Sequence, residues 1–152
     1  MNIDVYMDFF MRINTLMRRT AHLRDEATIR GLGEAYDIAW NRGDVQALIS
    51  CFTLDAIVIN PRGEVTTGKA EFEKVIIQLF RGPFKDSMHK TKIIRIHFPK
   101  KDVAVVDGEA ILTVLKPFEG SSELIHRYTD VMVKEGDRWL ISDTRAYGLM
   151  ES

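Results

Sequence analysis

The apolar residues of this chain change their spacing at Gly82-Pro83, and this change limits the possible folds more than any other feature. Before it, apolar side chains recur every three or four residues, which indicates amphipathic helices. After it, they alternate with polar residues over residues 88–98, 103–115, 123–134 and 138–147, which indicates four long strands. Helices followed by a meander of strands predict an α+β fold with a mostly antiparallel sheet.

Three helices should cover one face of that sheet, at residues 25–41, 44–52 and 72–80. Gly43 can end the first of them in a left-handed turn, and Asp44 can cap the second. A small hairpin at residues 56–67 should separate the second helix from the third.

The segment 1–24 precedes this domain, which we expect to span residues 25–152. It has apolar residues at helical spacing, from Ile3 to Met17, so it predicts an amphipathic helical extension. Its acidic residues come first and its arginines last, the reverse of the order in a secretory signal, and no stretch of the chain is long enough to span a bilayer. We expect this helix to pack on the body or on a partner chain, not on a membrane.

Composition narrows the classes of partner. A chain of 152 residues with 45% apolar residues can bury one core, and a net charge of −1 offers no field that would attract nucleic acid. Cys51, the single cysteine, falls in an apolar pattern that predicts a buried, inert thiol and suits the cytoplasm. The four histidines show no metal-ligand spacing and there is no glycine-rich phosphate loop, so we expect neither a metal nor a cofactor.

The register of the last hairpin can be predicted from its turn. Gly136-Asp137 fits a two-residue type II′ loop, which pairs Glu135 with Arg138. Continued along the strands, this register places Met132 opposite Ile141 on the face that the helices cover.

The same register places Asp130 opposite Asp143 and Tyr128 opposite Arg145. Burial and like charge should then make the two aspartates share one proton, with Arg145 favouring ionisation of Asp143. Asp130 is the most informative of these residues, because a buried carboxylate is costly unless it is bonded or protonated. The opposite face of the hairpin, with Val131 and Val133, is apolar and predicts a homodimer interface.

Two segments of the chain also resemble a known family. Residues 36–63, YDIAWNRGDVQALISCFTLDAIVINPRG, and residues 129–141, TDVMVKEGDRWLI, resemble the SnoaL-like and ketosteroid isomerase-like branches of the nuclear-transport-factor-2-like superfamily. The resemblance implies a cone-shaped sheet wrapped on helices, with a pocket at the open end and commonly a homodimer. It does not fix the activity, because this fold hosts isomerases, cyclases, dehydratases and non-catalytic domains.

The resemblance also implies roles for three residues. Tyr36 matches the oxyanion-hole tyrosine of the isomerases, and Asp130 matches their second donor, a protonated aspartic acid that serves as a standard example of a raised pKa. Asn60 stands where the isomerases have their aspartate base. An amide has no useful basicity, so ketosteroid isomerisation is not expected.

Two hypotheses follow. The first is a pocket for a small, largely apolar oxygenated molecule; as an enzyme it would be an isomerase, cyclase or lyase without cofactor, in which Tyr36 and Asp130 donate to a carbonyl and Asp143 or His126 replaces the missing base. The expected pocket walls are Trp40, Phe52, Val58, Phe72, Ile76, Phe80, Tyr128, Met132 and Arg145. The second is a ligand-binding or oligomerisation domain without catalysis.

Overall fold

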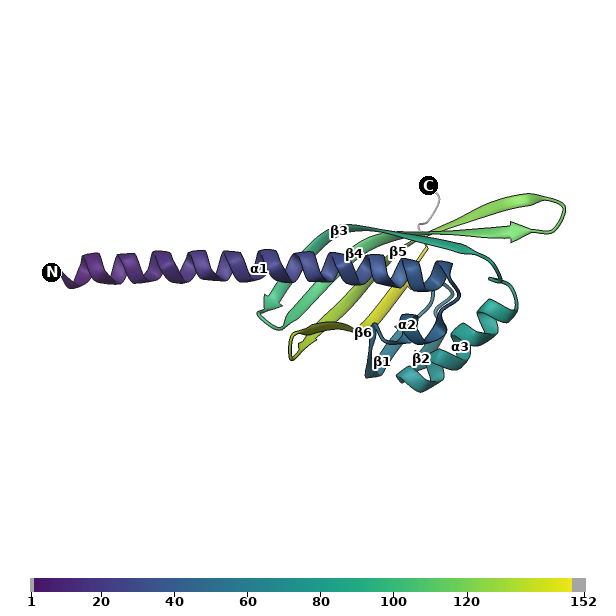
Figure 1. The fold of residues 1–152 in the computed structure, drawn as a ribbon, viewed down its shortest axis with the longest axis horizontal. Helices are drawn as coiled ribbons and strands as arrows, with labels where there is room; N and C mark the ends of the chain where they lie inside the picture. Colours follow the sequence, from purple (N-terminus) through teal and green to yellow (C-terminus); the bar gives the residue numbers. More distant parts are fainter. Residues whose placement is uncertain (1, 149–152) are drawn as a thin grey trace.

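The computed structural model describes residues 2–148 and confirms the α+β fold (Figure 1). Three helices lie against one curved, open sheet. The helices are α1 (Ile3–Asn41), α2 (Val45–Ile49) and α3 (Lys69–Arg81), and the strands are β1 (Phe52–Ile59), β2 (Val65–Thr67), β3 (Met88–Lys100), β4 (Val103–Lys116), β5 (Gly120–Glu135) and β6 (Arg138–Tyr147).

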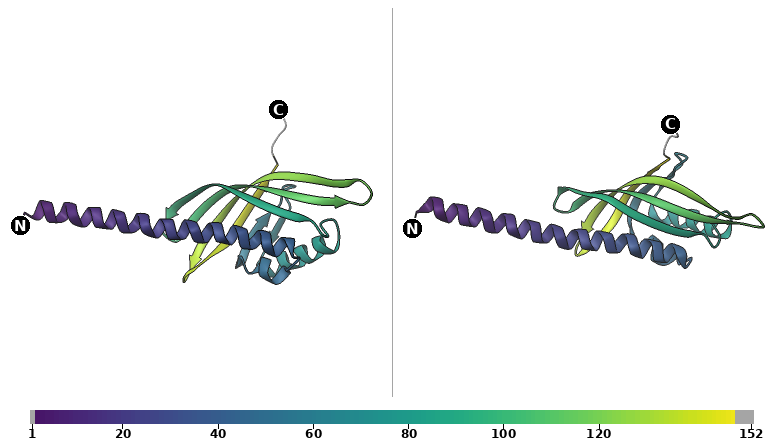
Figure 2. Two further views of the ribbon diagram at one scale, coloured as in Figure 1. Left: turned by 45° about the horizontal axis from the view of Figure 1, so that its top comes forward. Right: turned by 90° about the horizontal axis from the view of Figure 1, so that it is seen from above.

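The strand order is β2-β1-β6-β5-β4-β3. Within the described residues, β1 and β6 pair in parallel and every other neighbouring pair is antiparallel. This agrees with the mostly antiparallel sheet that the sequence predicts. The sheet arches over α1, which crosses its inner face close to the edge strand β3 (Figure 2). The core between them includes Ile29, Leu48, Ile76 and Val106, all fully buried.

The helix α1 is longer than expected, because the predicted extension and the first predicted helix form one continuous helix of 39 residues. The N-terminal half projects from the body (Figure 1). His22 makes an early contact with the sheet by stacking on Phe98, with 4.7 Å between ring centroids, and Asp25 is the first buried residue of the helix. The extension therefore does not pack on its own body, and its packing on a partner chain stays a prediction.

Local signals in the sequence set the turn between α1 and α2. Gly43 adopts a φ of 65°, in the left-handed region that suits glycine. The side chain of Asp44 accepts a hydrogen bond from the amide of Ala47 at 3.0 Å and so caps α2. Cys51 follows as a buried residue, and burial raises the pKa of its thiol to about 11, which keeps it protonated and unreactive.

The predicted register of the last hairpin is correct near the turn and wrong beyond it. Gly136 has a φ of 62°, and Glu135 pairs with Arg138 and Met132 with Ile141, as expected. A β-bulge then adds one residue to β6, so that Asp130 faces Thr144 and Asp143 faces Val131. Because side chains alternate between the faces of a sheet, one extra residue moves every later side chain of the strand to the opposite face.

Because of this bulge, two predictions from the sequence are wrong. Asp143 and Arg145 lie on the outer face, where Arg145 Nη2 donates to Asp143 Oδ1 at 3.0 Å. They do not face Asp130, so the proton shared between two aspartates does not exist, and Thr144 takes the inward position that was expected for Asp143.

A buried polar contact joins α1 to the last hairpin. Asp25 Oδ1 accepts hydrogen bonds from Trp139 Nε1 at 3.0 Å and from Lys134 Nζ at 3.1 Å. Trp139 is 2% exposed, so its indole N–H has no access to water if Asp25 is lost.

We expect Asp25→Ala to lower the free energy of unfolding by about 1–3 kcal/mol, because it leaves a buried donor without a partner. Asp8→Ala is the matched control on the same helix: Asp8 pairs with Arg12 at an exposed site, where an ion pair contributes about 0–1 kcal/mol. Urea unfolding followed by circular dichroism measures both. Equal losses in the two variants would contradict this role for Asp25.

Candidate functional site

A mostly apolar cavity of about 80 Å³ lies between α1, α3 and the inner face of the sheet. Its lining contains eight of the residues predicted for the site: Tyr36, Phe52, Val58, Phe72, His126, Tyr128, Asp130 and Met132. It also contains eight residues that were not predicted: Leu32, Gly33, His89, Thr91, Ile93, Ala110, Ile141 and Thr144. The structure therefore brings Tyr36, His126 and Asp130 to one cavity.

The other predicted site residues lie elsewhere. Trp40 and Ile76 are buried in the core, and Phe80 packs edge-on against Trp40. Asn60 forms a turn: its Oδ1 accepts from the amides of Arg62 and Glu64, both at 3.0 Å. Asn60, like Asp143 and Arg145 on the outer face, is not part of the cavity wall.

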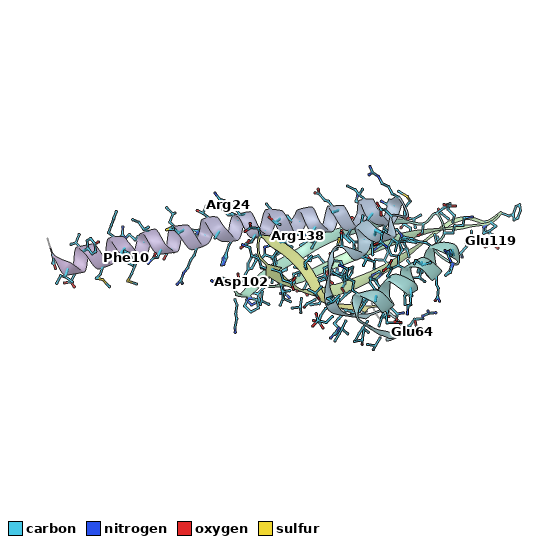
Figure 3. The ribbon with its side chains drawn as sticks, turned by 60° about the horizontal axis from the view of Figure 1, so that its bottom comes forward. Phe10, Arg24, Glu64, Asp102, Glu119 and Arg138 are labelled. Carbon is cyan, nitrogen blue, oxygen red and sulfur yellow. The ribbon has the colours of Figure 1, made fainter. Side chains whose placement is uncertain are left out.

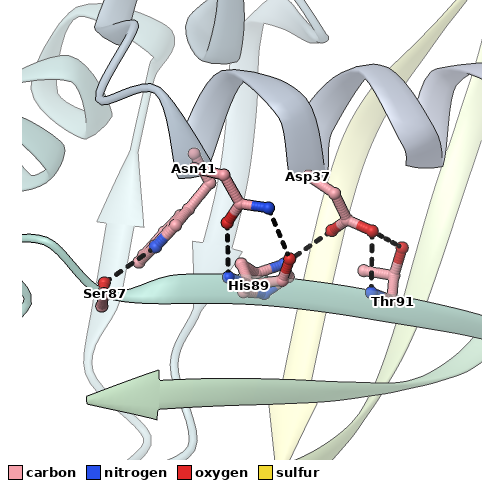
Figure 4. Close-up of polar contacts among 6 residues, drawn as sticks. Asp37, Asn41, Ser87, His89 and Thr91 are labelled. Carbon is pink, nitrogen blue, oxygen red and sulfur yellow. Dashed lines mark hydrogen bonds and ion pairs between the residues drawn. The ribbon is translucent and has the colours of Figure 1, made fainter. Parts of the chain in front are cut away.

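The most organised polar group near the cavity is a pair that was not predicted from the sequence: His89 on β3, which lines the cavity, and Asp37 on α1, which contacts it but is not part of the wall. His89 Nδ1 lies 2.8 Å from Asp37 Oδ1, and both side chains are largely buried. Asp37 Oδ2 accepts from the amide and the hydroxyl of Thr91, at 2.8 and 2.9 Å (Figure 4). A carboxylate can only accept, so it holds the proton on Nδ1 and leaves the lone pair of a neutral ring on Nε2.

Two further contacts from α1 hold β3 in place. Asn41 accepts from the backbone amide of His89 at 2.6 Å and donates to its carbonyl at 3.2 Å, and Trp40 Nε1 donates to Ser87 Oγ at 3.0 Å (Figure 4). β3 is an edge strand, so its outward backbone groups have no neighbouring strand to bond. Side chains of α1 replace that strand, and they fix the position of the imidazole at the same time.

Asp130 supplies the second chemical group of the cavity. It is 7% exposed, and its Oδ1 atom has no hydrogen-bond partner among the described residues. Burial raises the pKa of Asp130 to about 7, an effect that the neighbouring Thr144 hydroxyl partly offsets. Near neutral pH the carboxyl group therefore exists in part as the neutral acid, which can donate a hydrogen bond.

Two tyrosines lie near this carboxyl group. Burial raises the pKa of Tyr36 and of Tyr128 well above the usual value for a phenol, and the charge of Asp130 adds to the effect, so both remain donors. Tyr128 lies directly over Gly108 of the neighbouring strand. A Cβ at position 108 would overlap the tyrosine ring, so only glycine leaves room for it.

His126 is the second histidine of the cavity wall. Burial lowers the pKa of His126, and any positive charge on the nearby His89 would lower it further, so the His126 ring is neutral near pH 7. A neutral imidazole can both donate and accept. The described residues contain no group of three histidine, cysteine or acidic side chains arranged to hold a metal ion, and no described helix is apolar enough to cross a membrane.

A strand-period signal could have identified His89 from the sequence. From residue 88 onward, Lys90 and Lys92 alternate with His89, Thr91 and Ile93, so the histidine belongs to the inner face. Asp37 gave no such signal, because an acidic residue beside a buried stripe is usually solvated.

Comparisons with known proteins support the same fold. The model of the SnoaL-like domain family matches residues 21–145. No curated protein matches the chain. Among solved structures, a putative scytalone dehydratase from Novosphingobium aromaticivorans is similar, with 19% identity, 87% of this chain and 89% of that chain covered, and a TM-score of 0.78.

Two more solved structures are similar at this level. A hexachlorocyclohexane dehydrochlorinase, LinA type 2, has 16% identity, coverage of 84% and 87%, and a TM-score of 0.75. A ketosteroid isomerase-like protein from Erwinia carotovora atroseptica has 20% identity, coverage of 82% and 96%, and a TM-score of 0.68. These likenesses show the fold, and the family model, which covers most of the chain, shows that the protein belongs to the SnoaL-like domain family.

Proposed function

We propose that this protein is a lyase that needs no cofactor and eliminates water or a similar small leaving group from a small, largely apolar carbonyl compound. The observation that carries the proposal is that His89, held by Asp37, lines the same apolar cavity as Asp130, whose Oδ1 atom has no hydrogen-bond partner among the described residues. A base and a donor in one mostly apolar cavity are the two groups that proton removal beside a carbonyl requires.

In the proposed reaction, His89 Nε2 takes the proton from the carbon beside the substrate carbonyl. The electron pair of that C–H bond moves to the carbonyl oxygen, where the protonated Asp130 and the Tyr36 hydroxyl stabilise the developing negative charge by hydrogen bonds. The carboxylate of Asp37 stabilises the imidazolium that forms. This assignment gives His89 the role of base that was expected of Asp143 or His126.

The electron pair then returns to form a carbon–carbon double bond, and the hydroxyl group on the next carbon leaves. It takes a proton from the His89 imidazolium or through His126 and departs as water, so that protons and electrons balance without an oxidant. Return of the proton to a different carbon would instead give an isomerase. The names of two similar structures, a dehydratase and a dehydrochlorinase, support elimination.

The second candidate is a binding or assembly domain without catalysis, and the small volume of the cavity favours it. In either case we propose a homodimer formed through the outer face of the sheet. On this face Val131 pairs with Val105, and Val133 pairs with Val103, across β4 and β5. The four valines form an apolar surface beside the ion pair of Arg127 and Glu109.

We expect His89→Ala to slow the loss of water from 3-hydroxycyclohexanone, a compact probe of this class, by about 10²–10⁴-fold. Asp37→Ala should lower the same rate roughly 10²-fold, because the His89 imidazole would no longer be held in position. Formation of the enone is followed by ultraviolet absorbance. His97→Ala is the control, since His97 is exposed on the same strand and should react like the wild type.

The tautomer of His89 gives a test that needs no substrate. Nitrogen-15 NMR of the neutral ring should show the proton on Nδ1 in the wild type and mainly on Nε2 in Asp37→Ala. A wild-type ring with its proton on Nε2 would leave His89 without a lone pair on that atom and would refute its role as the base of the proposed lyase.

Asp130 should make stability depend on pH. Its pKa is about 7 in the folded chain, against about 3.9 in an unfolded chain, so the folded state binds more protons between pH 4 and 7. The contribution of Asp130 to stability is therefore complete below pH 4, decreases as the pH rises through this window, and stays low above pH 7.

Asp130→Asn cannot ionise, so its stability should not fall over this pH range as that of the wild type does. Between pH 4 and pH 8, we expect the free energy of unfolding of the variant to rise relative to that of the wild type by on the order of 4 kcal/mol. Urea titrations at both pH values measure this difference, with Asp102→Asn in the exposed turn between β3 and β4 as the control. A difference between variant and wild type that is the same at both pH values would show that Asp130 is an ordinary ionised carboxylate.

Replacing both Val131 and Val133 with lysine should halve the mass of the particle measured by light scattering. Four lysines would meet at a twofold interface from which water is excluded. Ala70→Lys combined with Gln78→Lys adds the same charge on the exposed side of α3 and should leave the mass unchanged. An unchanged mass in the valine variant would disprove this interface.

A further inference from the structure

The projecting half of α1, residues 3–21, has no tertiary contact that would explain why it is helical. Each of its residues is exposed, and the first buried residue of the helix is Asp25. The segment is also rich in β-branched and aromatic residues, such as Val5, Tyr6 and Phe9, which are weak helix formers. Most of the stability of a helix in a protein comes from packing its apolar face and not from propensity, so we expect a partner to cover this segment.

Apolar side chains of the segment follow a seven-residue repeat. Positions a, d and g of that repeat carry Ile3, Tyr6, Phe9, Phe10, Ile13, Leu16, Met17 and Leu23, each between 39% and 77% exposed, with Thr20 at the last d position. We call this set the a/d/g face. Figure 3 shows side chains all along the projecting helix, with Phe10 labelled near its free end.

The a/d/g face does not point toward the sheet of its own chain. In the body, α1 turns the stripe of Asp25, Ile29, Leu32 and Tyr36 toward the core and the cavity. At about 100° per residue, the centre of the a/d/g face lies roughly 130° around the helix from that stripe. The a/d/g face therefore points away from the side of α1 on which its own sheet lies. A partner that covers this face must bind from another side of the helix.

The area of the face matches a protein interface. Eight large side chains at these exposures present on the order of 800 Å², which is more than the few hundred Å² of the largest apolar patch on a typical monomer. It is also about the area that each partner contributes to an interface of standard size.

We propose that the a/d/g face pairs with the same face of a second copy of this chain, with the two helices antiparallel. The charges of the segment support this direction, because Asp4 and Asp8 lie at one end and Arg18 and Arg19 at the other. An antiparallel pair brings the acidic end of each helix beside the basic end of the second copy, whereas a parallel pair would place like charges together.

One register covers the a/d/g face from Ile3 to Thr20 and leaves Leu23 outside the overlap. It places Phe10 opposite Ile13, Tyr6 opposite Met17 and Ile3 opposite Thr20 of the second copy. The overlap then ends before His22, where α1 meets its own sheet. This contact is separate from the outer face of the sheet and does not depend on the proposed activity.

Disulfide cross-linking of the full chain tests the direction and the register together. In Ile3→Cys combined with Thr20→Cys, mild oxidation should give a covalent dimer on a non-reducing gel. The two positions are about 25 Å apart along one helix, so they cannot link within a chain. Cys51 does not compete, because it is 3% exposed.

Three matched variants decide the outcome. Ile3→Cys alone and Thr20→Cys alone should stay monomeric on the gel. Adding Phe10→Glu to the double variant should reduce the amount of covalent dimer at least tenfold. Adding Thr15→Glu, on the polar side of the helix, should leave that amount unchanged. Cross-linking of a single variant would show a parallel pair and overturn the proposal. So would an unlinked double variant, including one whose chain instead sediments with phosphatidylglycerol vesicles.

Discussion

The bonds between one turn of α1 and the edge strand β3 determine most of the site. Asp37 and Asn41 satisfy backbone groups of His89 and Thr91 that the sheet leaves unpaired, at distances between 2.6 and 3.2 Å. An unpaired edge is a liability in any open sheet, and here its closure also sets the tautomer and the orientation of a histidine. The same side chains therefore close the edge of the sheet and position His89, so a substitution at Asp37 or Asn41 should affect both the packing of β3 and the chemistry of the site.

The cavity behind this edge separates two kinds of group. The pair of Asp37 and His89 comes from α1 and β3, while Asp130 and Tyr128 come from β5, on the inner face of the sheet. Burial raises the pKa of Asp130 and of both tyrosines, so the tyrosines remain protonated. The low polarity that makes the carboxyl group expensive to ionise is the same property that makes it a useful donor.

The fold could be predicted from the sequence because it depends on long periodic patterns. The alternation in residues 88–147 and the stripes of the helices survive small local errors. The site could be predicted only in part. Tyr36, Asp130 and five of the expected walls are present, but one bulged residue in β6 moved Asp143 and Arg145 to the outer face, and a bulge leaves no periodic trace in the sequence. The proposed base was missed for a different reason: Asp37 and His89 are 52 residues apart, and only the packing of α1 on β3 brings them together.

If the proposed function is right, a carbonyl compound binds between His89 and Asp130. A crystal structure of the protein with cyclohex-2-enone, a stable compound with the carbonyl and double bond of the expected product, tests this most directly. We predict density in the cavity, with the carbonyl oxygen within hydrogen-bonding distance of Asp130 and Tyr36 and a ring carbon next to Nε2 of His89. An empty cavity at saturating concentration, or a carbonyl that points away from Asp130, would contradict the proposed function.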